Sequence, residues 1–399
     1  MKVRSTVGAI AALAVFSGTA WAEDISVKIG VLNDRSGIYS DITGEGSVAA
    51  AKMAVEDFLA KNSGVKVEIV SADHQNKPDI ASNIARKWYD EDNVDIIADL
   101  PASSTALAVA EVSREKDKIV FVSGGGTSDL TGKNCSPNTI HWTYDTWALA
   151  NGTASAMVGE GIKKWFFITA DYAFGHALER DTSELVKASG GEVLGAARYP
   201  YPGQDFSSYL LQAQQSGAQA IGLANAGGDF INSVKQASEF GIVQGGQNLA
   251  GLLVFISDVH ALGLQAAQGL YLTEAFYWNQ NDKTRAWSDR FSKLMNGSKP
   301  GSAHAGVYAS VLHYLDAVKK ANSKDAKAVM AQLKSAPVED DLFGKSTVRP
   351  DGRVTHDMYL YKVKTPAEST GDWDYYTVAA TIPADKAFRP VDEAKCNFK

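Results

Sequence analysis

The sequence predicts an α/β protein with two lobes, each built around a parallel sheet. Short apolar segments alternate with segments of helical periodicity, and the alternation starts again near residue 163. The chain has 399 residues, more than a single hydrophobic core usually serves, so two domains are expected. No internal repeat of about 20–50 residues is evident, which argues against a solenoid.

The first array begins with a strand at 25–34, in which Val27, Ile29 and Val31 alternate with other residues. Residues 94–100 are apolar apart from Asp95 and Asp99, and a fully buried parallel strand is expected there. Short connections between the elements imply parallel strands with right-handed crossovers. The other expected elements of this array are strands at 65–73 and 118–124 and helices at 46–61, 79–92 and 103–116.

The second array repeats the same pattern. Its expected strands are 163–172, 191–200, 218–227 and 248–257, and its expected helices are 174–190, 205–217 and 229–241. A further strand at 270–279 precedes helices at 283–295 and 305–322. Residues 346–382 are rich in strand formers, and they are expected to add strands to the existing lobes rather than start a third domain.

The first 22 residues have the pattern of a secretory signal peptide. Lys2 and Arg4 precede a short apolar run, and small residues around Trp21 fit cleavage after Ala22. We therefore expect an exported protein of the periplasm. Losing Lys2 and Arg4 would move the formal net charge from −7 to −9, which argues against a nucleic-acid partner. No later run approaches about 18 apolar residues, so no membrane-embedded segment is expected.

Cys135 and Cys396 are the only cysteines of the sequence. An even pair in an exported protein favours a disulfide, which would close a loop of about 260 residues. Two free buried thiols are the alternative. Two cysteines without suitably spaced histidines do not make a structural zinc site, so no metal is expected.

The common catalytic and cofactor motifs are absent or misplaced. Gly44–Ala49 matches G-x-G-x-x-A, but about ten residues separate it from its strand, so a helix start is the simpler interpretation. The three glycines from Gly124 lack the lysine of a P-loop. Neither a G-x-S-x-G elbow nor H-E-x-x-H is present. No catalytic residue and no cofactor are predicted, and an exported hydrolase is a remote alternative.

Two loops look like a binding site. Pro101–Thr105 follows the third strand and Gly124–Thr127 the fourth, and open α/β sheets bind ligands at such carboxyl ends. Both loops combine hydroxyls with backbone amides, which suits a small anion such as a carboxylate. For Ser103 and Ser104 alone, helix capping explains the sequence equally well.

Four segments resemble motifs of exported substrate-binding proteins of branched-chain amino-acid-type ABC transporters. They are EDISVKIGVLNDRSGIYSDITG, PASST, SGGGTSDLTG and DYAFG, in the order and spacing of that family. The resemblance to the leucine/isoleucine/valine-binding protein group covers nearly the whole expected mature chain. It implies two Rossmann-like lobes with parallel sheets, joined by three crossover hinge segments, in the type I periplasmic binding protein fold. It also implies a ligand held between the lobes, with closure by bending at the hinge.

The resemblance implies the boundaries of the two lobes and the partners that the protein binds. Residues 23–144 and 275–350 are expected to form the N-terminal lobe, and residues 145–274 and 351–399 the C-terminal lobe. The protein is expected to be a monomer that delivers a small-molecule carboxylate to an inner-membrane ABC permease.

The family's carboxylate clamp is carried over by motif. Ser103 resembles the serine whose hydroxyl holds the ligand carboxylate, and Ser104 would replace it if the loop is shifted by one residue. Gly125, Gly126 and Thr127 resemble the family's second carboxylate clamp, in which Thr127 would supply a hydroxyl and a backbone amide.

Aromatic residues complete the predicted site. Tyr172 resembles the second-lobe tyrosine that closes over the ligand, and Tyr39 lies where the family often places an aromatic lid. Phe255 could pack on a ligand ring, although sheet core is an equally good interpretation. Asn225 follows another parallel strand, where it faces the cleft or caps a helix.

One departure from the family bears on the ligand. In the amino-acid binders, the strand resembling 248–257 ends near an acidic residue that pairs with the ligand ammonium, whereas Leu253 and Phe255 are apolar. An apolar lining does not compensate a buried ammonium. The sequence therefore favours an aromatic or hydrophobic acid, such as a benzoate- or cinnamate-like compound. A hydrophobic amino acid is the alternative if Asp258 or Asp229 reaches the cleft.

Overall fold

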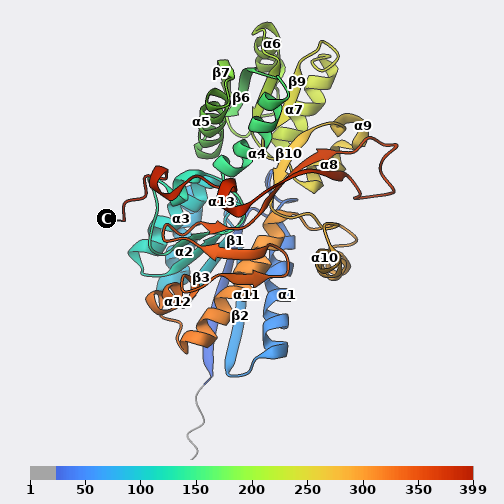
Figure 1. The fold of residues 1–399 in the computed structure, drawn as a ribbon. Coiled ribbons are helices and arrows are strands. Elements are labelled where there is room, and N and C mark those ends of the chain that lie inside the picture. Colours follow the sequence, from blue (N-terminus) through green and yellow to red (C-terminus); the bar gives the residue numbers. More distant parts are fainter. Residues whose placement is uncertain (1–23, 399) are drawn as a thin grey trace, which may run out of the picture.

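The computed structural model describes residues 24–398, and the predicted signal peptide lies outside them. The chain folds into two α/β lobes, one above the other, with the C-terminal strands at their junction (Figure 1). Among the described residues, no helix is both long enough and apolar enough to cross a bilayer.

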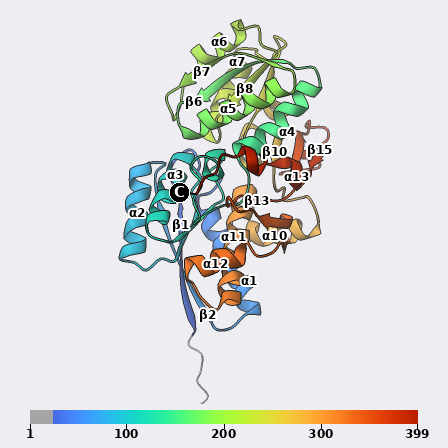
Figure 2. The same ribbon diagram turned by 60° about the vertical axis from the view of Figure 1, so that its left-hand side comes forward.

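The first lobe is built on a five-stranded parallel sheet of order β2-β1-β3-β4-β5. Helices α1 and α11 cover one face of this sheet, and α2 and α3 cover the other (Figure 2). The strands are β1 (Ile25–Asn33), β2 (Val65–Asp73), β3 (Ile96–Asp99), β4 (Ile119–Val122) and β5 (Thr139–His141). The helices are α1 (Gly44–Lys61), α2 (Pro78–Asp90), α3 (Ser103–Glu115), the 3-10 helix η1 (Ser128–Thr131), α10 (Asp282–Leu294), α11 (Ser302–Ala321) and α12 (Ala326–Leu333).

The second lobe is built on a four-stranded parallel sheet of order β7-β6-β8-β9. Apolar residues of α4 and α5 pack on one face, and those of α6 and α7 pack on the other. The strands are β6 (Lys164–Ala170), β7 (Glu192–Tyr199), β8 (Ala220–Ala224) and β9 (Asn248–Gly251). The helices are α4 (Thr146–Gly159), α5 (Ala173–Ala188), α6 (Ser207–Gln215), α7 (Gly228–Glu239), α8 (Ile256–Leu262) and α9 (Leu264–Ala267).

Two antiparallel sheets of three strands complete the molecule, with orders β10-β14-β15 and β11-β12-β13. The strands are β10 (Tyr271–Glu274), β11 (Val338–Asp340), β12 (Gly344–Val348), β13 (Val354–Thr355), β14 (Met358–Val363) and β15 (Tyr376–Ile382), followed by α13 (Ala384–Ala387) and the 3-10 helix η2 (Val391–Glu393). The strand-rich end therefore adds strands to the lobes, as the sequence predicts.

Three segments connect the lobes. They join β5 to α4, β10 to α10, and β13 to β14. The first and last of these lie side by side, because His141 in β5 and Arg353 before β13 form a parallel bridge. The predicted fold, with two parallel sheets and three crossovers, is confirmed.

The structure differs from the sequence prediction in several places. Helices α4, α9 and α12 and strands β5 and β11 are not predicted. Nearly every side of α4 is buried, so it lacks the polar face that marks an amphipathic helix. The strand predicted at 248–257 ends at Gly251, and α8 begins at Ile256, where the carboxylate of Asp258 accepts a hydrogen bond from the N–H of Phe255 at 2.9 Å.

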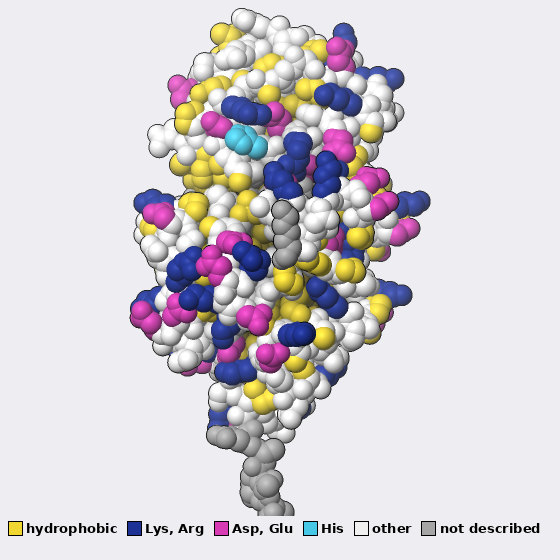
Figure 3. Space-filling model, turned by 90° about the vertical axis from the view of Figure 1, so that its left-hand side faces the viewer, with side chains coloured by type: hydrophobic (Ala, Val, Ile, Leu, Met, Phe, Trp, Pro, Cys, Tyr) yellow, Lys and Arg dark blue, Asp and Glu magenta, His cyan; other side chains and the backbone are white. Residues whose placement is uncertain are grey.

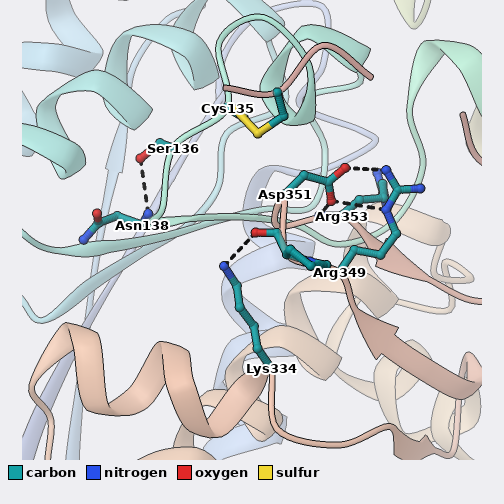
Figure 4. The surroundings of a disulfide bond; sticks show 9 residues. Cys135, Ser136, Asn138, Lys334, Arg349, Asp351 and Arg353 are labelled. Atoms are coloured by element: carbon teal, nitrogen blue, oxygen red, sulfur yellow. Dashed lines mark hydrogen bonds and ion pairs between the residues drawn. A yellow bond between two sulfur atoms is a disulfide. The ribbon is translucent and has the colours of Figure 1, made fainter. Parts of the chain in front are cut away.

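The predicted disulfide joins Cys135 to Cys396, and the structure has no free cysteine among residues 24–398. The alternative of two free thiols is therefore wrong. Figure 4 shows the bond near Arg349, Asp351 and Arg353. It ties the end of the chain, which is predicted to belong to the second lobe, to a loop of the first. The predicted residue boundaries of the lobes stay a prediction.

Candidate ligand-binding site

A small cavity of about 10 Å³ lies between the lobes, at the carboxyl ends of strands from both parallel sheets. Each residue that lines it follows a parallel strand. The lining consists of Tyr39, Ile42, Pro101, Gly124, Tyr144, Tyr172, Phe174, Ala226, Leu253 and Phe255. None of these side chains is charged, so the space suits an apolar or aromatic body.

The structure brings some of the predicted site residues to this space. Tyr39, Tyr172 and Phe255 line it. Six others do not line it but belong to the same loops; they are Ser103, Ser104, Gly125, Gly126, Thr127 and Asn225. Asn225 is buried, and its amide nitrogen donates to the hydroxyl of Ser233 in α7 at 3.3 Å. The ligand contacts assigned to all nine residues stay a prediction.

Ser103 and Thr127 join the two predicted clamp loops. The hydroxyl oxygen of Ser103 accepts a hydrogen bond from the N–H of Thr127 at 3.1 Å. Helix α3 begins at Ser103, but its N-cap makes no side-chain hydrogen bond, so neither Ser103 nor the half-buried Ser104 acts as a cap. The Thr127 hydroxyl accepts from the N–H of Asp129 at 3.3 Å and starts η1. Both hydroxyls therefore hold the loops in place.

The carbonyls of the glycine loop point into the protein. His141 Nε2 donates to the carbonyl of Gly125 at 2.7 Å, and the N–H of Thr146 donates to that of Gly126 at 2.8 Å. Burial lowers the pKa of His141 well below its usual value, so the imidazole is neutral. The N–H groups of Gly125 and Gly126 donate to no other atom of residues 24–398. Two adjacent free amides suit an anion.

The glycines are needed for close packing. A Cβ at Gly125 would lie 2.7 Å from the carbonyl oxygen of Leu100. A Cβ at Gly126 would lie 2.9 Å from the ring of Phe174, which belongs to the second lobe. Any side chain at Gly126 would therefore push the lobes apart.

Tyrosines and backbone close the cleft. The hydroxyls of Tyr39 and Tyr172 are hydrogen-bonded to each other across it. The ring of Tyr172 stacks on Tyr201, with centroids 3.9 Å apart. The N–H of Gly228 in the second lobe donates to the carbonyl of Ile38 in the first at 3.3 Å. The lobes are thus in contact, and a ligand enters only when they separate.

The acidic residues named as possible partners of an ammonium do not line the space. Asp258 is engaged with the N–H of Phe255, and Asp229 accepts from the hydroxyl of Tyr199 at 2.9 Å. Glu274 on β10 is buried as well. Burial raises the pKa of Asp258 to about 7, that of Asp229 to about 6 and that of Glu274 to about 8.

Sequence reasoning missed two of the aromatic lining residues. The hydroxyl of Tyr144 donates to the carbonyl of Gly124 at 2.6 Å, and its ring lies 5.8 Å from that of Phe255. Phe174 is part of the DYAFG motif itself. The sequence signal that could have located Tyr144 is the neighbouring Asp145, which caps the N-terminus of α4.

Comparisons with known proteins agree with this geometry. A family model described as periplasmic binding protein matches residues 26–372, so the chain belongs to that family. A periplasmic binding protein from Burkholderia mallei has a crystal structure with 51% identity and a TM-score of 0.90, covering 93% of this chain and 98% of its own. A branched chain amino acid ABC transporter periplasmic ligand-binding protein from Burkholderia xenovorans has 41% identity and a TM-score of 0.83, covering 93% of this chain and 99% of its own.

More distant relatives differ in their named ligands. The "Leu/Ile/Val-binding protein homolog 6" of Brucella melitensis is 25% identical, over 91% of this chain and 94% of its own. A solute-binding protein from R. palustris, solved in complex with benzoate, is 21% identical with a TM-score of 0.80, over 94% of this chain and all of its own; this likeness shows the fold alone. The predicted family is confirmed, and the chain is a periplasmic binding protein of an ABC transporter.

Proposed function

We propose that this protein captures a small aromatic carboxylate between its lobes and delivers it to an ABC importer. The ring lies among Tyr39, Tyr172, Tyr144, Phe174 and Phe255, and the carboxylate lies on the free amides of Gly125 and Gly126. Binding and closure of the lobes are the whole mechanism, and no covalent step is involved.

The observation that carries this proposal is the combination of an aromatic lining with free amides and no charged side chain. Backbone amides stabilise a carboxylate without a cationic partner. Leaving a ligand ammonium unpaired in the same space would cost several kcal/mol, on the order of the penalty for burying one ion. An aromatic acid places its carboxylate on the amides and leaves no charge unpaired. An α-amino acid also offers a carboxylate, but its ammonium would stay unpaired.

A hydrophobic amino acid is the second candidate. The 41%-identical structure is named for branched-chain amino acids. Asp258 and Glu274 are buried close enough to Tyr144 that their negative charge would raise the pKa of its hydroxyl further. This candidate requires one of these carboxylates to turn toward the ligand.

Thermal unfolding with a ligand panel separates the candidates. Benzoate, 4-hydroxybenzoate and cinnamate form one arm, and leucine, isoleucine and phenylalanine form the other. A ligand at 100 times its Kd should stabilise the protein by about 2.7 kcal/mol, which gives a clear shift of the unfolding temperature. Stabilisation by the amino acids alone would overturn the aromatic-acid proposal.

The cellular part of the proposal is also testable. The chain is secreted, cleaved after Ala22 and monomeric in the periplasm, where it meets the permease. The mass of the protein purified from periplasm should correspond to a chain that starts at Glu23. A mass that includes residues 1–22 would contradict the predicted cleavage.

A further inference from the structure

The end of the chain forms a fourth link between the lobes. We call residues 383–398 the tail. The tail first runs along the second lobe, where Nδ2 of Asn151 in α4 donates to the carbonyl of Lys386 at 2.8 Å. It then returns to the first lobe, where Cys396 is bonded to Cys135.

Arg389 is the main contact of the tail with the second lobe. Its guanidinium lies over Trp147 in α4, 3.9 Å from the ring centroid. It pairs with Glu184 at 2.9 Å and Asp181 at 3.2 Å, both in α5. The side chain of Arg389 is 18% exposed, so solvent screens these pairs less than it screens a surface ion pair. Its carbonyl accepts from Nη1 of Arg349 at 2.7 Å.

Asp181 makes a second contact between the lobes. It is fully buried, and one of its carboxylate oxygens accepts from the hydroxyls of Ser128 at 2.7 Å and Thr146 at 2.6 Å. The neighbouring Arg180 pairs with Asp129 at 3.0 Å. Ser128 and Asp129 belong to the first lobe, whereas Arg180 and Asp181 belong to α5. The bonds from Ser128 and Asp129 therefore exist only while the lobes are in contact.

This contact is continuous with the glycine loop. Ser128 directly follows Thr127, and its N–H donates to the hydroxyl of Thr146 at 3.0 Å. The N–H of Thr146 in turn donates to the carbonyl of Gly126. A shift of the glycine loop therefore moves both hydroxyls that Asp181 accepts from.

The basic residues of this region serve the contact rather than an anion. Figure 3 shows Lys and Arg side chains gathered near the junction of the lobes. The cavity beneath the tail has a volume of about 210 Å³, and its arginines are Arg180, Arg349, Arg353 and Arg389. Each of these guanidiniums already bonds a carboxylate or a carbonyl of the protein.

We propose that the tail is a latch that holds the lobes together. The disulfide fixes one end of the tail to the first lobe, and Arg389 holds α5 of the second lobe beside the Asp181 contact. The latch sets what fraction of the ligand-free protein is closed, and so it sets the apparent affinity without touching the ligand. It holds for whatever ligand the cleft takes, so it stands apart from the proposed function.

The test uses the ligand-free, full mature chain. R389Q removes both charge pairs between the tail and α5, and E184Q removes the one with Glu184. Glu184 is 48% exposed, so E184Q is not expected to disturb folding. R198Q is the matched control, because Arg198 pairs with Glu179 at 2.9 Å entirely within the second lobe. R389Q and E184Q should increase the radius of gyration in small-angle scattering and speed amide exchange at Ser128 and Thr146 by about tenfold. R198Q should change neither quantity.

A second comparison tests the role of the disulfide. The double variant C135S/C396S should open the protein as R389Q does. Combining all three substitutions should open it no further, because releasing either end of the tail has the same effect. The proposal is wrong if R389Q and E184Q match R198Q, or if the effects of R389Q and C135S/C396S add.

Discussion

Gly126 controls how closely the two lobes approach each other. Its carbonyl is bonded to the N–H of Thr146, and a Cβ would meet the ring of Phe174 at 2.9 Å. The sequence indicated that bare backbone was needed here, and it placed Tyr39 and Tyr172 in the site by motif. It could not show that Phe174 from the second lobe is the contact, because a packing partner distant in the chain leaves no local pattern.

Gly126→Val should abolish ligand-induced stabilisation while the protein remains folded. The added side chain would collide with Phe174 and keep the lobes apart, and overpacking of this kind typically costs about 1–3 kcal/mol. Gly159→Val is the matched control, because nothing lies within 4 Å of a Cβ at that exposed position. Thermal shift with the ligand identified by the panel measures both. Normal binding by Gly126→Val would mean that the loop is only a turn.

Tyr172→Phe should weaken ligand binding about fivefold. The change removes the hydroxyl that bonds Tyr39 across the cleft, and one hydrogen bond contributes about 1 kcal/mol to closure. Stacking of the ring on Tyr201 is kept. Calorimetric titration gives the Kd, with Tyr209→Phe on α6 as the control. An unchanged Kd in Tyr172→Phe would show that the hydroxyl pair does not contribute to closure.

At the level of secondary-structure elements, strands and helices with a strong hydrophobic periodicity are predicted well. Strand β2 matches its prediction residue for residue, and α1 and α3 match closely. Elements without a pattern are missed: α4 is apolar on nearly all sides, and β5 has three residues. The residues that these elements place in the site, above all Tyr144 between them, are missed for the same reason.

Strand β10 carries a buried acid that makes stability depend on pH. Glu274 accepts hydrogen bonds from the hydroxyls of Ser302 and Tyr376, and burial raises its pKa to about 8. Its pKa in the unfolded chain is about 4.3. Between these values the native state binds more protons than the unfolded state, so stability falls as pH rises from about 5 to 8.

Glu274→Gln should therefore be more stable than the unmodified protein at pH 8, by a few kcal/mol (about 2–4), and nearly equal to it at pH 5. The glutamine amide is neutral at both pH values and keeps hydrogen-bonding groups for Ser302 and Tyr376. Urea unfolding at the two pH values gives the difference. Glu339→Gln, at an exposed position of β11, should show no such pH-dependent gain. A gain of equal size at pH 5 and pH 8 would refute a role for the ionised carboxylate.

At the level of the whole molecule, the chain crosses between lobes more often than its array pattern indicates. The three crossovers follow from the family resemblance, whereas the return of the tail to the first lobe does not. The sequence predicted the bond between Cys135 and Cys396 from their number and export alone. It could not show that Arg389, between α13 and Cys396, would meet α5, because an isolated arginine near the end of a chain has no periodic context.

Reducing this disulfide should lower the unfolding temperature by several degrees. The bond joins residues separated by 261 positions, and such a long closure contributes about 3–5 kcal/mol in the chain-entropy model. Calorimetry with and without a reductant measures the effect, and a mass increase of two hydrogens verifies the reduction. The variant C135S/C396S should unfold at the lower temperature in both conditions, since it has no bond to break. If the fully reduced protein unfolds at the same temperature as the oxidised one, the prediction is wrong. Residual structure in the unfolded chain, or compensation in the native state, would then offset the closure entropy. The tail would then be held to the first lobe by its non-covalent contacts alone.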